Sequence, residues 1–137
     1  MLPKLREWLK DIAQTAGFSV EATQLVLLVV EEMAANITEH GYGNRPGEPL
    51  WVTARTDSRG LLEIVIEDAA PEYDWESVPE LDLHELALEG ATRGRGRPLA
   101  RLLTRDIGHR HRPDGGNELS LRFDAVTLER RLKERES

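Results

Sequence analysis

One long segment, from Ser19 to His40, constrains this chain more than any other. Its apolar residues recur at helical spacing and Ser19 is a good helix N-cap, so we predict a helix over this range. Glu32, Asn36 and His40 are spaced i, i+4 and i+8, and they continue a face that begins with apolar residues. Burying a carboxylate, an amide and an imidazole is costly without polar partners. The face therefore predicts either satisfied core groups or a site for a polar ligand.

The side chains on this face suit a metal-bound phosphate. The amide oxygen of Asn36 is a hard ligand of the kind that Mg²⁺ takes in proteins. The carboxylate of Glu32 can orient a nucleophile or accept its proton. The structural alternative is an amphipathic helix that binds no ligand. Its polar residues would then lie where the helix frays toward the glycine-rich segment that starts at Gly41.

Patterns elsewhere in the chain predict an α+β domain. Helices are expected over Pro3–Ala16, Ser19–His40, Leu81–Glu89 and Pro98 to about Arg105, and strands over Leu50–Thr56, Leu61–Glu67, Ile107–Arg112 and Asn117–Phe123. Turn residues join the strands into two antiparallel hairpins, and a charged helical tail covers Ala125–Glu134. We expect a two-layer sandwich, with helices on one face of a mostly antiparallel sheet. It forms a single domain over 1–137, with its core at about 5–123 and its tail at 124–137.

A second polar group ends the strand predicted at Leu61–Glu67. Strand alternation gives an apolar face that finishes in the carboxylate of Asp68. A carboxylate at the inner end of a strand can accept a hydrogen bond from the amino group of a heterocycle. Ala70, Tyr73 and Asp74 follow it. The alternative is that Asp68 only caps the turn after the strand.

A third group combines glycine and arginine before a predicted helix. Gly94 and Gly96 alternate with Arg93, Arg95 and Arg97. Glycines before a helix start let backbone N–H groups face an anion, and the guanidinium groups add charge for phosphate oxygens. The alternative is a flexible basic loop, since there is no Walker-type Lys-Ser/Thr pair after it.

The three groups together resemble the GHKL ATPases, the fold shared by gyrase B subunits and histidine kinases. The form Glu-x-x-x-Asn-x-x-x-His-x-Tyr is most similar to the anti-sigma-factor serine kinases. The resemblance implies that Glu32 is the catalytic base, that Asn36 holds Mg²⁺ and that Asp68 reads the adenine amino group. It also places His40 and Ala70 at the nucleotide, and Arg93, Gly94, Arg95 and Gly96 in a lid over the phosphates.

The sequence departs from that family in three places. Ala70 and Arg93 stand where the family has glycine, and the chain starts in a helix where relatives begin with a strand. These departures leave open a second interpretation, a protein-binding module on the same fold that has lost catalysis. A nucleotide-independent structural adaptor is the third.

The resemblance implies an ATP- and Mg²⁺-dependent kinase. Its substrate would be a Ser or Thr of an anti-sigma-antagonist protein, its other partner a sigma factor or another regulatory target, and a homodimer is compatible with it. The net charge of −7 argues against a nucleic-acid binder, and no apolar run is long enough for a membrane span. The absence of cysteine excludes disulfides, and cytoplasm is the expected compartment. His109 and His111 share a strand face, but two histidines make a weak metal site.

Overall fold

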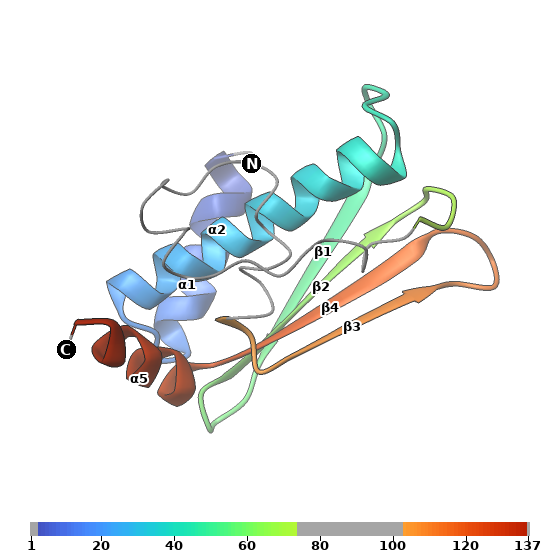
Figure 1. The fold of residues 1–137 in the computed structure, drawn as a ribbon. Helices are drawn as coiled ribbons and strands as arrows, with labels where there is room; N and C mark the ends of the chain where they lie inside the picture. Colours follow the sequence, from blue (N-terminus) through green and yellow to red (C-terminus); the bar gives the residue numbers. More distant parts are fainter. Residues whose placement is uncertain (1–2, 74–102, 137) are drawn as a thin grey trace.

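A computed structural model describes residues 3–73 and 103–136 of the chain (Figure 1). Its helices are α1 (Pro3–Thr15), α2 (Val20–Asn36), the π-helical turn η1 (Ile37–Gly41) and α5 (Ala125–Glu136). Its strands are β1 (Leu50–Thr56), β2 (Leu61–Asp68), β3 (Asp106–His111) and β4 (Asn117–Asp124).

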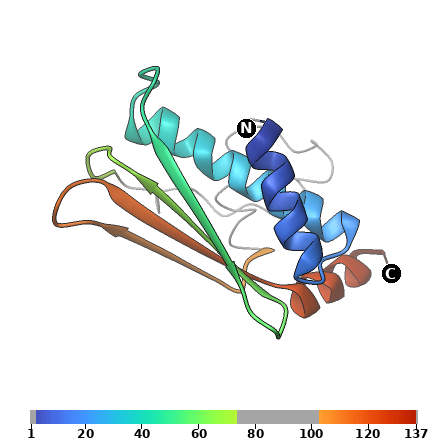
Figure 2. The ribbon, with the colours of Figure 1, turned by 180° about the vertical axis from the view of Figure 1, so that it is seen from behind.

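The described strands form one antiparallel sheet in the order β1-β2-β4-β3. The two long central strands are β2 and β4, and β1 and β3 are its edges. Both views show α1, α2 and α5 on one side of this sheet (Figures 1 and 2). The predicted two-layer α+β sandwich is confirmed.

The start of α2 is fixed by hydrogen bonds to its first turn. The hydroxyl of Ser19 accepts from the Ala22 N–H at 3.1 Å, as its N-cap position predicts. The Ser19 N–H donates to the carboxylate of Glu129 on α5, at 2.9 Å. Gly17 ends the turn after α1 with a φ of 97°, which a residue without Cβ adopts most easily. The end of the chain is therefore tied to the start of the central helix.

The core lies between the helices and the inner face of the sheet. Strand alternation puts every second residue of β2 and β4 into it, because successive side chains point to opposite faces. The charged C-terminal helix also contributes, since Ala125 and Leu128 are buried in the same cluster as the sheet residues. The largest fully buried side chains are Phe123, Leu9, Leu27, Met33, Ile37, Leu62, Ile64, Ile66, Leu121 and Leu128.

The strand predictions are confirmed to within one residue at each end. The helix expected from Ser19 to His40 ends as an α-helix at Asn36 and continues as the π turn η1. The helix predicted at Leu81–Glu89, and most of the one predicted from Pro98, fall outside the described residues. None of the helices within the described ranges is long and apolar enough to cross a membrane.

Candidate functional site

The last turn of α2 presents a buried amide with an unused donor. Asn36 is 7% exposed, and among the described residues its Nδ2 has no hydrogen-bond partner. Glu32, one turn earlier, is half-buried. A buried amide donor without a partner loses free energy, so an orphan of this kind needs an explanation. Within the described residues Asn36 is therefore not fully satisfied, and an acceptor on a polar ligand would complete its Nδ2.

His40 does not continue this buried face, so that expectation was wrong. Its side chain is exposed, and its nearest ionic neighbour is Glu39, with 4.0 Å between His40 Nε2 and Glu39 Oε2. The cause is η1, in which the Tyr42 N–H bonds to the Ile37 carbonyl five residues back. The wider turn rotates the residues after Asn36 away from the positions that a continuous α-helix would give them.

Asp68 ends β2 as a buried carboxylate, 1% exposed. Its Oδ1 accepts from the Ala70 N–H at 2.9 Å and from Nδ2 of Asn117 at 2.8 Å. The first bond is the turn cap that the alternative interpretation requires. The second ties Asp68 to the neighbouring strand β4, where Asn117 is its register partner. The carboxylate is thus held in one orientation by two donors.

Asn117 connects three strands. Its Nδ2 also reaches the carbonyl oxygens of Ala70 and Pro71, each at 3.2 Å, and its Oδ1 lies 3.0 Å from Nδ1 of His111 on β3. Because Nδ2 must be the donor toward a carboxylate, Oδ1 is an acceptor, and His111 therefore donates from Nδ1. We call the buried pair Asp68 and Asn117, together with the exposed His111 at the edge of the sheet, the buried row.

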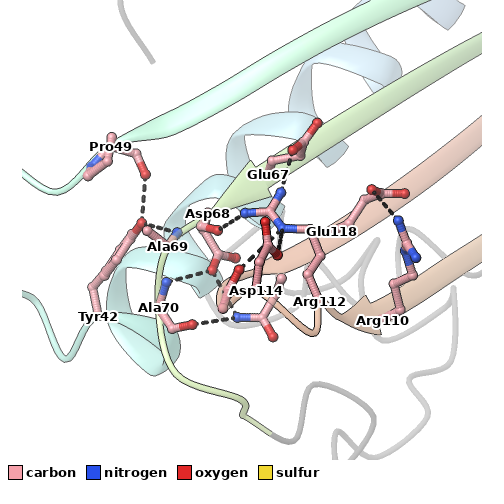
Figure 3. A network of polar contacts seen from close by, with 12 residues as sticks. Tyr42, Pro49, Glu67, Asp68, Ala69, Ala70, Arg110, Arg112, Asp114 and Glu118 are labelled. Atoms are coloured by element: carbon pink, nitrogen blue, oxygen red, sulfur yellow. Dashed lines mark hydrogen bonds and ion pairs between the residues drawn. The ribbon is translucent and has the colours of Figure 1, made fainter.

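Tyr42 joins the α2 side of the site to Asp68 and its neighbours. Its hydroxyl accepts from the Ala69 N–H at 2.6 Å and donates to the Pro49 carbonyl at 2.7 Å (Figure 3). Burial raises the pKa of this phenol above 10.0, against the lowering effect of the Ala69 N–H. A Cβ on Gly41 would lie 3.2 Å from atoms of Ala70 and Tyr73, so η1 and the segment after β2 are in close contact. The first two sequence groups therefore meet at one end of the molecule.

Arg112, in the turn between β3 and β4, bonds to two residues at the end of β2. Its guanidinium pairs with the carboxylate of Glu67 and donates to the Asp68 carbonyl at 3.0 Å (Figure 3). The same turn brings Gly116 so close that a Cβ would overlap the Asp68 carbonyl oxygen, and Gly116 has a φ of 83°. The turn therefore requires glycine here, and it fixes the strand that carries Asp68.

The sequence interpretation assigned no role to Asn117, Arg112 or Gly116. A signal existed for Asn117, because alternation places it on the apolar face of β4, as it places Asp68 at the end of β2. The contacts of Arg112 and Gly116 join positions far apart in the chain, and periodicity carries no signal for them. In the part of the chain that the structure describes, no three histidine or carboxylate side chains gather as a metal site, His109 and His111 included.

The glycine–arginine group lies outside the described residues. Arg93, Gly94, Arg95 and Gly96, and also Asp74 of the second group, fall in the range 74–102. Their predicted contacts with nucleotide stay predictions.

Helices on one face of an antiparallel sheet, with a buried amide and a buried carboxylate at one end, are the architecture of GHKL ATPases. The family model described as "Histidine kinase-like ATPase domain" matches residues 1–123, and the chain belongs to this family. Among curated proteins none matches the chain significantly. Among solved structures, the fold is similar to the histidine kinase domain of a blue-light activated histidine kinase from Erythrobacter litoralis.

That comparison has a TM-score of 0.55 at 17% sequence identity and covers 80% of this chain. The chain spans about half of the matched structure, 47% of its length. At this identity the likeness concerns the fold. Family and fold together make the chain a kinase-like ATPase domain, a class that binds ATP.

The described residues fit a nucleotide with Mg²⁺. Asn36 can supply a hard oxygen ligand, Oδ1, for the cation, while its Nδ2 has no partner among the described residues and is available to an acceptor on the nucleotide. Asp68 is buried, and two donors to Oδ1 hold it in place. Asn36 would hold the cation and Asp68 the base, and the cation would supply charge neutralisation for the phosphates.

Proposed function

We propose that this protein is an ATP-dependent serine/threonine kinase of the anti-sigma-factor type. The observation that supports this most is the orphan amide of Asn36 one turn after Glu32, next to the segment that carries Asp68. In the proposed reaction a hydroxyl oxygen of the protein substrate bonds to the γ-phosphorus of ATP, and the bond to the leaving ADP oxygen breaks. The hydroxyl proton passes to Glu32.

The proposed substrate is a Ser or Thr of a small anti-sigma-antagonist protein. A phosphate there adds charge that can break the interface between the two proteins. The kinase domain would then bind a sigma factor or another regulatory target. The proposed setting is the cytoplasm, and Arg93, Gly94, Arg95 and Gly96 would close over the phosphates.

A thermal melt with and without Mg-ATP tests the nucleotide site. At one hundred times its Kd, a ligand adds about 2.7 kcal/mol to the free energy of unfolding. Asn36→Ala should lose the Mg²⁺-dependent part of this shift and remain folded. Glu39→Ala, an exposed residue on the adjoining turn, is the matched control and should keep it. Equal stabilisation of the parent and Asn36→Ala would refute the Mg²⁺ role of Asn36.

Glu32→Gln separates chemistry from binding. The variant should bind Mg-ATP as the parent does and transfer no phosphate, because the base contributes to the reaction rather than to affinity. The readout is phosphate incorporation into the antagonist protein. Transfer at the parent rate by Glu32→Gln would exclude the base role.

The second candidate is the protein-binding module without phosphoryl transfer. Ala70 favours it, because it stands at a position where the family has glycine. Its prediction is a parent protein that binds Mg-ATP and its partner but leaves the partner unphosphorylated. The structural adaptor differs again, since Mg-ATP would not shift its melting temperature.

A further inference from the structure

The described sheet ends in two edge strands that are built differently. Each of them has one neighbour, β2 for β1 and β4 for β3, and Figure 2 shows β1 (green) as the outer strand on its side. An edge strand offers unpaired backbone N–H and C=O groups to any extended chain. Proteins therefore protect such edges with charged residues, prolines, bulges or covering segments.

The β3 edge carries several of these protections. Its ionisable residues are Asp106, His109, Arg110 and His111. At its start the Arg105 N–H donates to the Arg122 carbonyl at 2.7 Å, while Asp106 is the register partner of the same residue. Two residues of this edge thus oppose one residue of β4, as in a β-bulge. The ring of Tyr73 also packs edge-on against His109, with 5.5 Å between the ring centroids. β3 is therefore a poor template for an added strand.

The β1 edge has none of these protections within the strand. It runs without proline or bulge, since every residue from Leu50 to Thr56 pairs one-to-one with a residue of β2. Arg55 is its single charged residue. Aromatic and β-branched types such as Trp51 and Val52 favour an extended chain. Among the described strands, β1 is thus the edge that is open to another strand.

The hydrogen bonds of the β1–β2 hairpin show which backbone groups of β1 face this edge. The Asp57 N–H donates to the Leu61 carbonyl at 3.1 Å, which makes these two residues a hydrogen-bonded pair of the antiparallel ladder. Such pairs alternate along the strands, so Arg55, Thr53 and Trp51 also turn their backbone groups toward β2. The outward N–H and C=O groups are therefore those of Leu50, Val52, Ala54 and Thr56.

The apolar layer under β1 is also incomplete. Leu50, Val52 and Ala54 pack against the core, but each of them stays partly exposed. Ile66 and Ile64, the register partners of Val52 and Ala54 on β2, are fully buried, and β2 has a strand on each side. A further strand beside β1 would cover the exposed apolar surface in the same way, and this burial favours its binding.

On the side away from the helices, Arg55 sets a charge preference. Its side chain is 75% exposed, and its Nη2 lies 2.6 Å from one oxygen of Glu63. The other oxygen of Glu63 accepts from Nε of Arg122 at 2.9 Å, so two guanidinium groups share one carboxylate. An acidic residue on an added strand would give Arg55 a carboxylate of its own. A second copy of β1 contains no acidic residue and does not match this position.

From these observations we propose that the outer edge of β1 binds an extended segment of a partner protein as an additional strand. The outward backbone groups of β1 would supply main-chain hydrogen bonds, and the alternation of side chains would supply selectivity. The segment would direct apolar residues toward the helices at every second position and place an acidic residue beside Arg55. The inference goes beyond the proposed phosphoryl transfer and does not depend on it.

Amide hydrogen exchange measured by NMR tests this geometry residue by residue. The probe is a short synthetic peptide with valine at alternate positions, threonine between them and one central glutamate. In the free protein the amides of Val52 and Ala54 should exchange faster than those of Thr53 and Arg55, which β2 protects. Millimolar peptide should slow exchange at Val52 and Ala54 roughly tenfold. The same peptide, N-methylated at the amides that would face β1, should not slow it, because it cannot donate to the edge.

Two variants of β1 separate backbone pairing from side-chain contacts. Val52→Pro removes one outward N–H and leaves the hydrogen bonds to β2 in place, as proline at an edge position allows. It should weaken peptide binding roughly tenfold. Val52→Ala is the matched control, because it shortens the same side chain but keeps the N–H, and it should weaken binding much less. Arg55→Glu should reverse the charge preference, so that a peptide with lysine in place of glutamate binds better.

Unchanged exchange at Val52 and Ala54 in millimolar peptide would overturn the proposal, and so would equal binding of the N-methylated peptide or protection of β3 in place of β1. Protection of the same amides without peptide, rising with protein concentration, would show that a second copy occupies the edge, which also contradicts the proposal. If Val52→Pro does not fold, the N-methylated peptide and Arg55→Glu give the same test, because neither alters the backbone pairing of β1 with β2.

Discussion

Two polar rows cross this sheet, one on each face. The buried row of Asp68, Asn117 and His111 is on the helix side of the sheet. On the side away from the helices, the strand register aligns a row of alternating charges, which we call the charge ladder: Arg55, Glu63, Arg122 and Asp106. Both use neighbouring strands to align side chains. The buried row carries one formal charge and satisfies it with fixed donors, while the ladder carries four and balances them in water.

Burial decides what each row contributes. A buried carboxylate without donors lowers the free energy of unfolding by as much as a typical destabilising substitution does. An exposed ion pair contributes only about 0–1 kcal/mol. The buried row therefore holds the Asp68 carboxylate in one orientation at the end of β2. The ladder contributes little to the stability of the fold, because water screens its charges. Substitutions should affect the two rows very unequally.

The largest effect should come from Gly116→Ala. The new Cβ would overlap the Asp68 carbonyl oxygen, and the positive φ of Gly116 is unfavourable for alanine. We expect about 3 kcal/mol loss in the free energy of unfolding, measured by urea titration. Gly115→Ala is the matched control, because its φ of 100° is also positive but a Cβ there meets nothing within 4 Å. It should cost only about 1 kcal/mol. Equal losses at both positions would show that conformation alone, and not the close approach to Asp68, explains them.

Asn117→Ala should have the next largest effect. It removes the side-chain donor of a buried carboxylate and leaves two carbonyl oxygens without that partner. We expect a loss of about 2 kcal/mol. Asn117→Asp sharpens the comparison, because it places a second carboxylate against Asp68. Like charges at this distance raise the pKa of the pair, so this variant should gain stability as the pH falls from 7. No difference between Asn117→Ala and the parent would mean that the buried row is not needed to hold Asp68.

The smallest effect should come from the ladder. Glu63→Gln should cost about 0.5–1 kcal/mol at pH 7, although Glu63 is only 13% exposed and has two arginine partners. The hydrogen bonds from Arg55 and then Arg122 lower the Glu63 pKa below its ordinary 4.5. A lowered carboxyl pKa stabilises the folded state above the unfolded pKa, and this contribution is lost as pH falls through the folded pKa. The parent and the variant should therefore converge in stability as the pH falls through the folded pKa of Glu63. A constant difference down to acid pH would exclude ionisation as the cause.

Much of the layout was predictable from local patterns. The alternation of β2 and β4 and the N-cap at Ser19 predicted the elements and the inward direction of Asp68. The burial of Asn36 also followed from helical spacing. The prediction that His40 continues the buried face was wrong, because a π turn inside an apparently continuous helix is not visible in a periodicity of 3.6 residues per turn.

The sequence alone determined the class of fold and the buried positions of Asn36 and Asp68, because spacing and alternation are local properties of the chain. Only the tertiary structure decided which groups meet. The bond from Asn117 to Asp68 joins residues 49 positions apart, and the bond from Arg112 to the Asp68 carbonyl joins residues 44 apart. The charge ladder depends on the register of all four described strands. Turn geometry fixes the register within each hairpin, but the pairing of β2 with β4 joins distant segments, and that pairing brings Asn117 and Arg112 to Asp68.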